Sequence, residues 1–230
     1  MKPRHPFRSK RRSWLTLLAS LPASVLPLHA QSPDATRDAT RSAGASAAPA
    51  GPLLVVGDSL SAEYGLARGS GWVELMRGRL RERGIGRTVV NASVSGETSA
   101  GGRSRIDGLL KRQQPSLVII ELGGNDALRG LDLASTRANL SEMVRRSQQA
   151  GARVLLLGMK VPPNYGRAYS EAFERVFSEV ARETGAALVP FFLEGLADRL
   201  EFFQTDRIHP NEAAQPRMLD NVWPALERLL

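Results

Sequence analysis

Short apolar segments alternate with longer amphipathic segments along the chain from Pro52 onward. The short segments are β-branched or Leu-rich, and their apolar residues are continuous rather than alternating, which is typical of strands that are covered on both faces. Five segments have this character: residues 53–56, 88–92, 117–122, 154–157 and 187–189. They predict a sheet of five strands.

The longer segments carry apolar residues at helical spacing and lie between the predicted strands. These segments cover residues 72–80, 106–110, 140–144 and 173–180. Three of them are followed by a glycine that is a plausible helix stop, at Gly84, Gly151 and Gly185. A last helix is expected from about residue 212 to the C-terminus, with Pro216 and Pro224 disturbing it.

Repeated alternation of strands and helices predicts an α/β protein whose parallel sheet carries helices on both faces. Ligands of such sheets bind outside the carboxyl ends of the strands. Polar residues that directly follow a predicted strand are therefore the first candidates for chemistry.

Residues 1–30 have the composition of a secretory signal peptide. A basic start without acidic residues precedes an apolar stretch, and we expect cleavage after Ala30. Pro22 and Pro27 leave that stretch too short to span a bilayer comfortably, so an uncleaved anchor is the minor alternative. Arg11 and Arg12 also permit a twin-arginine signal. These features predict a periplasmic or secreted protein without stable membrane insertion after cleavage.

Residues 31–51 are polar and aperiodic and predict a disordered linker. Residues 52–230 then form one domain, which is long enough to bury its own core. The formal charge of +8 changes this picture little, because six of the 31 basic residues lie within the predicted signal peptide. Beyond residue 30 the chain carries 25 basic and 23 acidic residues, and such a nearly neutral surface predicts no nucleic-acid partner.

The residue inventory excludes several kinds of site. The chain has no cysteine, which rules out thiol nucleophiles and thiolate metal sites. Two of the three histidines, His5 and His29, lie in the predicted signal peptide, so His209 is the single histidine left and a multi-histidine zinc site is excluded. Phosphate-binding loops, dinucleotide-binding loops and the G-x-S-x-G nucleophile elbow are also missing. We expect no cofactor and no metal.

His209 stands in a sequence context that suits a general base. Asp206 precedes it by three residues, so that the carboxylate can reach the ring and fix its tautomer. Pro210 biases His209 away from helical dihedral angles and helps to present the ring. The alternatives are a structural or surface histidine and an aspartate that caps a helix.

Small polar clusters follow three of the predicted strands. Ser59 follows the first strand after Gly57, which permits a tight turn, although Asp58 and Ser59 could also be a helix-capping pair. Gly96 can offer a backbone N–H and Asn125 a carboxamide N–H, although each alone is as readily a turn residue. If these two donors and the Ser59 N–H point at the same place, the three together would form an oxyanion hole.

Four sequence blocks in order resemble the SGNH hydrolases, also called the GDSL esterase/lipase family. They are Gly57-Asp58-Ser59-Leu60, Gly96, Gly124-Asn125-Asp126 and Asp206-x-x-His209. Longer stretches, including residues 123–130, 162–166 and 208–211, resemble the bacterial thioesterase I/arylesterase/lysophospholipase group within that family.

The resemblance implies a three-layer α/β/α sandwich with a flavodoxin-like sheet. It also implies hydrolysis of acyl esters and thioesters, with Ser59 as nucleophile, His209 as base and Asp206 orienting it. The Ser59 and Gly96 N–H groups and the Asn125 side chain would bind the oxyanion. Glu63 and Arg207 depart from the family pattern, which often has glycine at both positions.

The substrate is expected to be a small-molecule acyl ester. Pro162, Asn164 and Tyr165, together with Leu128, are the candidate substrate-binding residues, and Leu131 and Phe202 or Phe203 could add apolar walls. Ordinary core or lid packing is the alternative for each of them. Two other functions remain open: a carbohydrate or peptidoglycan O-acetylesterase with the same triad, and a secreted binding module without activity.

Overall fold

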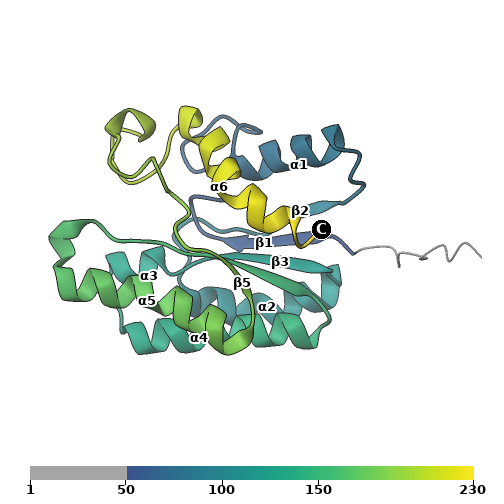
Figure 1. The fold of residues 1–230 in the computed structure, drawn as a ribbon, viewed down its shortest axis with the longest axis horizontal. Helices are drawn as coiled ribbons and strands as arrows, with labels where there is room; N and C mark the ends of the chain where they lie inside the picture. The colour runs from purple at the N-terminus through teal and green to yellow at the C-terminus, as the bar shows by residue number, and fades with distance from the viewer. Residues whose placement is uncertain (1–50) are drawn as a thin grey trace, which may run out of the picture. The chain divides into compact units, whose positions relative to one another are not determined.

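A computed structural model describes residues 51–230 of the protein. The predicted signal peptide and residues 31–50 of the predicted linker lie outside the described residues. The described part is a three-layer α/β/α sandwich around a five-stranded parallel sheet of order β2-β1-β3-β4-β5 (Figure 1). The strands are β1 (Leu53–Gly57), β2 (Val89–Asn91), β3 (Leu117–Glu121), β4 (Arg153–Leu157) and β5 (Ala187–Val189). The predicted α/β/α fold is thus confirmed.

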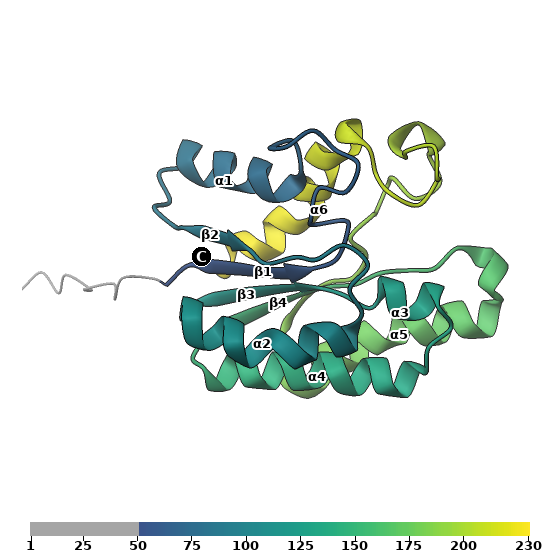
Figure 2. The same ribbon diagram turned by 180° about the vertical axis from the view of Figure 1, so that it is seen from behind.

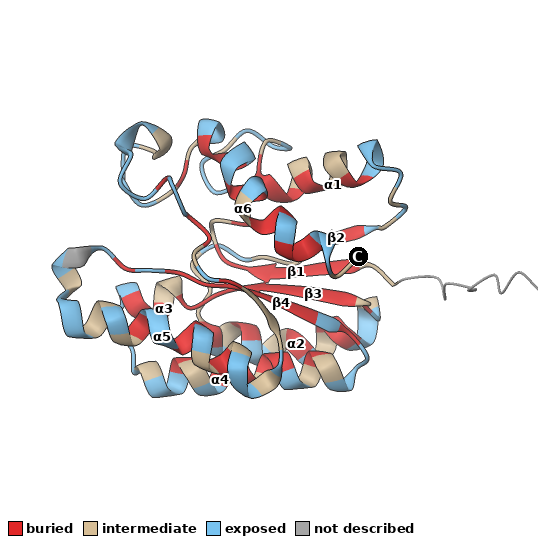
Figure 3. Cartoon of the chain, viewed as in Figure 1, coloured by how far each residue is buried: buried red, intermediate tan, exposed pale blue. Residues whose placement is uncertain are grey.

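Burial explains why the central strands are apolar apart from Glu121 at the end of β3. Every residue of β1 and β3 is buried, because helices cover both faces of the sheet (Figure 3). The two strands pair in register from Leu53 beside Leu117 to Gly57 beside Glu121. The edge strands β2 and β5 have only three residues each, so the predicted strand 88–92 was too long at both ends.

Two groups of helices cover the sheet. On one face lie α1 (Trp72–Glu82) and α6 (Gln215–Glu227), which contact each other. On the other face lie α2 (Ser99–Gln113), α4 (Leu133–Gln149) and α5 (Arg167–Thr184), packed in that order (Figures 1 and 2). Short helices, α3 (Gly124–Leu128), η1 (Pro163–Tyr165), η2 (Leu200–Phe202) and η3 (Glu212–Ala214), lie in the connections.

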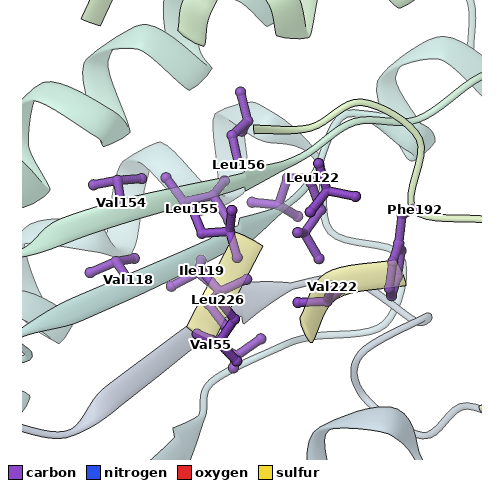
Figure 4. Packing of buried hydrophobic residues seen from close by; sticks show 14 of the residues in the cluster. Val55, Val118, Ile119, Leu122, Val154, Leu155, Leu156, Phe192, Val222 and Leu226 are labelled. Atoms are coloured by element: carbon purple, nitrogen blue, oxygen red, sulfur yellow. The ribbon is translucent and has the colours of Figure 1, made fainter. Parts of the chain in front are cut away.

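The last helix differs from its prediction. Residues 212–214 form the separate turn η3, and α6 begins at Gln215. Pro216 lies in the first turn of α6, where backbone N–H groups have no partner within the helix. Its missing N–H therefore costs no helical hydrogen bond, and the prediction that Pro216 disturbs the helix is wrong. Pro224 does lie inside α6. Val222 and Leu226 of that helix belong to the same buried cluster as Val55 and Ile119 of the sheet (Figure 4).

No helix within residues 51–230 is both long enough and apolar enough to cross a membrane. The carboxyl ends of the strands lead into the segments that contain α3, η1 and η2, and these segments extend beyond the sheet on one side (Figure 1). The residues singled out in the sequence follow the strands at this edge.

Candidate active site

Ser59 lies two residues beyond the end of β1, in a tight turn. The N–H of Ala62 bonds to the Asp58 carbonyl at 2.9 Å and that of Tyr64 to the Ser59 carbonyl at 3.3 Å. Gly57 is required at the start of this turn. A Cβ atom there would approach both Glu121 Oε2 and Ser61 Oγ to 2.8 Å. The absence of a side chain at residue 57 therefore lets the turn lie directly on the end of β3.

His209 and Asp206 reach Ser59 from the segment that precedes η3. His209 Nε2 lies 3.0 Å from Ser59 Oγ, and His209 Nδ1 lies 2.6 Å from Asp206 Oδ2. The other carboxylate oxygen, Oδ1, accepts the N–H groups of Ile208 at 2.9 Å and His209 at 3.0 Å. When Nδ1 carries the proton and donates a hydrogen bond to Asp206, the lone pair of Nε2 points at the serine hydroxyl.

The electrostatics keep Asp206 ionised. Desolvation acts to raise its pKa, but the backbone N–H of His209, the His209 ring and the N–H of Ile208 together lower that pKa to about 2. A permanent carboxylate beside Nδ1 is the arrangement that stabilises an imidazolium when the ring takes up a proton.

Asn125 and Gly96 lie at the same edge of the sheet. Asn125 is in the first turn of α3, a helix that the sequence did not predict, and its Nδ2 donates to Asp58 Oδ2 at 2.8 Å and to the Glu97 carbonyl at 3.1 Å. Gly96 has a φ of +76°, a conformation that side chains disfavour, and its carbonyl accepts a hydrogen bond from Arg129 at 2.9 Å. The Asn125 carboxamide thus lies between the carbonyl of Glu97, which is the neighbour of Gly96 in the chain, and the side chain of Asp58, which precedes Ser59.

A buried pair of acids lies beneath these groups. Asp58 is 3% and Glu121 is 1% exposed, and Glu121 Oε2 accepts the Ser61 hydroxyl at 2.8 Å and the Asp58 N–H at 3.3 Å. Desolvation raises the pKa of Asp58 to about 6 and, together with the Asp58 charge, raises that of Glu121 well above its usual value. The sequence reasoning missed Glu121, although a lone acid in an otherwise apolar strand is a recognisable signal.

A mainly apolar cavity of about 470 Å³ lies beside the segment that carries Asp206 and His209, because Arg207 and Ile208 of that segment line it. Its lining residues are Gly124, Leu128, Met159, Lys160, Val161, Pro162, Phe191, Leu193, Ala197, Asp198, Phe203, Arg207 and Ile208. Leu128, Pro162 and Phe203, which the sequence suggested as substrate-binding or wall residues, are among these lining residues.

The other candidate substrate-binding residues do not line the cavity. Asn164 and Tyr165 lie in η1, and the Tyr165 hydroxyl bonds to the carbonyl of Leu128 at 3.4 Å. Leu131 and Phe202 are also absent from the lining. Tyr165 thus connects η1 to the end of α3, whose residue Leu128 lines the cavity.

The two departures from the family pattern both have left-handed backbone. Glu63 has a φ of +58° and Arg207 a φ of +59°. These are conformations that glycine adopts without strain, which explains why glycine is common there. The Glu63 carboxylate accepts the N–H groups of Gly69 at 3.1 Å and Gly71 at 2.8 Å, so its side chain orders the loop before α1.

Within residues 51–230, no three histidine, aspartate or glutamate side chains are grouped so that they could hold a metal ion. The acids nearest to Ser59 have the partners described above.

Comparison with known proteins gives a consistent result. The GDSL-like Lipase/Acylhydrolase family matches residues 55–216. Esterase TesA of Pseudomonas aeruginosa is 54% identical over 183 residues, which are 80% of this chain and 91% of that protein. Thioesterase 1/protease 1/lysophospholipase L1 of Escherichia coli strain K12 is 40% identical over 184 residues, which are 80% of this chain and 87% of that protein.

The solved structures agree with this result. The crystal structure of TesA superimposes with a TM-score of 0.77 at 54% identity and covers 78% of this chain and 99% of that one. Serine, glycine, asparagine and histidine at one edge of a matching sheet, and a family match over most of the domain, lead to one conclusion. The chain belongs to the GDSL-like lipase/acylhydrolase family and is an ester hydrolase.

Proposed function

We propose that the protein cleaves carboxylic esters through an acyl-enzyme formed on Ser59. The observation that carries this proposal is the continuous series of short contacts from Asp206 through His209 to Ser59. Nucleophile, base and orienting acid at such distances are the arrangement of an activated serine.

The reaction takes place in two steps. Ser59 Oγ attacks the acyl carbonyl while its proton moves to His209 Nε2, and His209 then gives this proton to the leaving oxygen or sulfur. A water molecule that loses a proton to the same nitrogen attacks the acyl-enzyme, and His209 returns the proton to Ser59 Oγ as the acid leaves. Asp206 stays ionised throughout and stabilises the transient imidazolium.

Asn125 is proposed to stabilise the oxyanion together with the N–H groups of Ser59 and Gly96. Its short bond to Asp58 fixes the orientation of the carboxamide. The longer bond, to the carbonyl of Glu97 at 3.1 Å, is the one that a negatively charged oxygen can displace. Each such donor is typically worth about 3 kcal/mol in the transition state.

The cavity points to the class of acyl group. Its apolar walls suit an alkyl or aryl acyl chain, and its volume of about 470 Å³ lies within the range typical of small-molecule sites. Medium-chain or aryl esters are therefore the proposed substrates, with thioesters and lysophospholipids as further candidates, since one relative is named a thioesterase and lysophospholipase. An O-acetylesterase for carbohydrates would need a polar cleft, whereas only Lys160, Asp198 and Arg207 among these lining residues are charged and the others are apolar.

We also propose that the protein is exported to the periplasm or the medium, because residues 1–30 have the composition of a signal peptide and residues 31–51 that of a linker. N-terminal sequencing of the exported protein tests this proposal. A mature chain that begins near residue 31 supports it, and one that still begins near Met1 refutes it.

Hydrolysis of p-nitrophenyl esters from acetyl to palmitoyl tests the catalytic proposal. The assay compares the wild type with Ser59→Ala, each in the presence of a chelator. We expect a rate maximum at one chain length, no effect of the chelator, and complete loss of turnover in the folded variant. Near-native activity of Ser59→Ala would show that another group is the nucleophile.

A further inference from the structure

Tyr64 lies on the turn that follows Ser59 and covers one side of the His209 ring. The centroids of the two rings are 4.4 Å apart, and the rings are inclined by 41°. Half of the Tyr64 surface is exposed, so the ring is not part of the core and its contact with His209 lies at the surface. Within residues 51–230 no hydrogen bond to the Tyr64 hydroxyl is found, so the contact with His209 involves the ring and not the hydroxyl group.

The Tyr64 turn is tied to the segment that carries His209. Gln204 Nε2 donates to the carbonyls of Tyr64 at 2.9 Å and Pro210 at 3.2 Å, and the Gln204 N–H bonds to the carbonyl of His209 at 2.8 Å. Gly65 allows this approach, because a Cβ atom there would lie 2.1 Å from Gln204 Oε1. The two segments therefore hold the two rings in a fixed relative position, although they are about 140 residues apart in the sequence.

We propose that Tyr64 is a positioning residue that holds the imidazole of His209 in place and stabilises its charged form during proton transfer. This inference rests on the function proposed for Ser59 and His209. An aromatic face attracts a cation that lies within about 6 Å of the ring centre. The ring also restricts rotation of the imidazole away from Ser59 Oγ.

Other charged groups surround the imidazole, and the Tyr64 variants leave them in place. Asp206 lies at Nδ1, at 2.6 Å. The charge of Asp58 also acts on His209, and Arg207 is two residues away along the chain. Burial raises the pKa of Asp58 to about 6, and this group is the same in the wild type and in every Tyr64 variant. A change of profile between variants at residue 64 then reports the loss of the aromatic face.

Three substitutions separate the aromatic ring from bulk and from the hydroxyl. Tyr64→Leu keeps an apolar side chain without a π face, and we expect kcat to fall about two- to fivefold with little change in KM. The acid limb of its pH profile should move to lower pH by about half a unit, because the imidazolium is less stable. Tyr64→Phe should retain the wild-type profile, and Tyr64→Trp should move the acid limb in the opposite direction.

The outcomes are distinguishable. Wild-type kcat and pH profile in Tyr64→Leu would overturn the inference, as would a loss confined to KM or an equal loss in Tyr64→Phe. Thermal melting checks that each variant is folded, and Tyr64→Trp still tests the inference if Tyr64→Leu does not fold. Measurement of Ser59→Ala in the same series separates the two proposals, because an active Ser59→Ala refutes the proposed function itself.

Discussion

Replacement of the buried Asp58 by asparagine should change how the stability of the domain depends on pH. Desolvation raises the pKa of Asp58 from 3.8 to about 6, although its hydrogen bonds with Leu60 and Asn125 act in the opposite direction. The native state therefore retains a proton at pH values where the unfolded chain has lost it. Stability falls as the pH rises through this interval, because the unfolded state gains charge that the folded state resists.

The magnitude follows from the shift. A change of about two pKa units at about 1.4 kcal/mol per unit gives a loss of about 3 kcal/mol between pH 4 and pH 7. The Glu121 pKa is raised as well and contributes a loss of the same sign in both proteins; this loss is smaller in Asp58→Asn, because the Asp58 charge is one cause of the shift, and it therefore adds to the expected difference. Asp206 has a lowered pKa and acts in the opposite sense, but only as the pH falls from about 4 toward 2. Between pH 4 and pH 7 the difference between Asp58→Asn and the wild type therefore reports the two buried acids, because groups outside this pair contribute equally to both proteins.

Urea denaturation followed by circular dichroism, at half-unit steps over this interval, measures the free energy of unfolding. We expect the fall between pH 4 and pH 7 to be smaller in Asp58→Asn than in the wild type by about 3 kcal/mol. The absolute stability of the variant does not enter this comparison. Asp107→Asn is the matched control, since Asp107 is a surface carboxylate paired with Arg146, and its profile should follow that of the wild type. Parallel profiles for Asp58→Asn and the wild type would refute the reasoning from burial.

Three further substitutions test other parts of the structure. Asn125→Ala removes the proposed oxyanion donor and should lower kcat by about 10²- to 10³-fold with little change in KM; a loss confined to KM would contradict the proposal. Ala197→Trp fills part of the acyl cavity and should reduce the rate on long-chain esters relative to acetyl esters by at least about tenfold in the p-nitrophenyl series. Phe177→Ala removes a fully buried ring that packs edge-on against Phe173, and should destabilise the domain by about 3–5 kcal/mol in urea, against less than about 1 kcal/mol for the exposed Leu200→Ala.

The sequence by itself determined the layers of the fold and the order of the polar blocks. Continuous apolar runs predict buried parallel strands because helices on both faces leave no side that needs polar residues. The predicted strand 187–189 matches β5, and the blocks around Ser59, Gly96 and Asn125 follow β1, β2 and β3 as predicted. Boundaries were less well determined, as β2 shows, because the last residues of an edge strand depend on the neighbour with which they pair.

Only the tertiary structure decided which side chains meet. The polar block at Gly124 becomes helix α3, which is too short for a periodic signal, and Asn164 and Tyr165 lie outside the cavity that their neighbour Pro162 lines. The contacts of Asp58 with Glu121 and of Tyr64 with His209 join residues 63 and 145 positions apart. Periodicity reports the environment of a residue relative to its own helix or strand, whereas such contacts depend on how the strands are ordered and where their connecting segments converge.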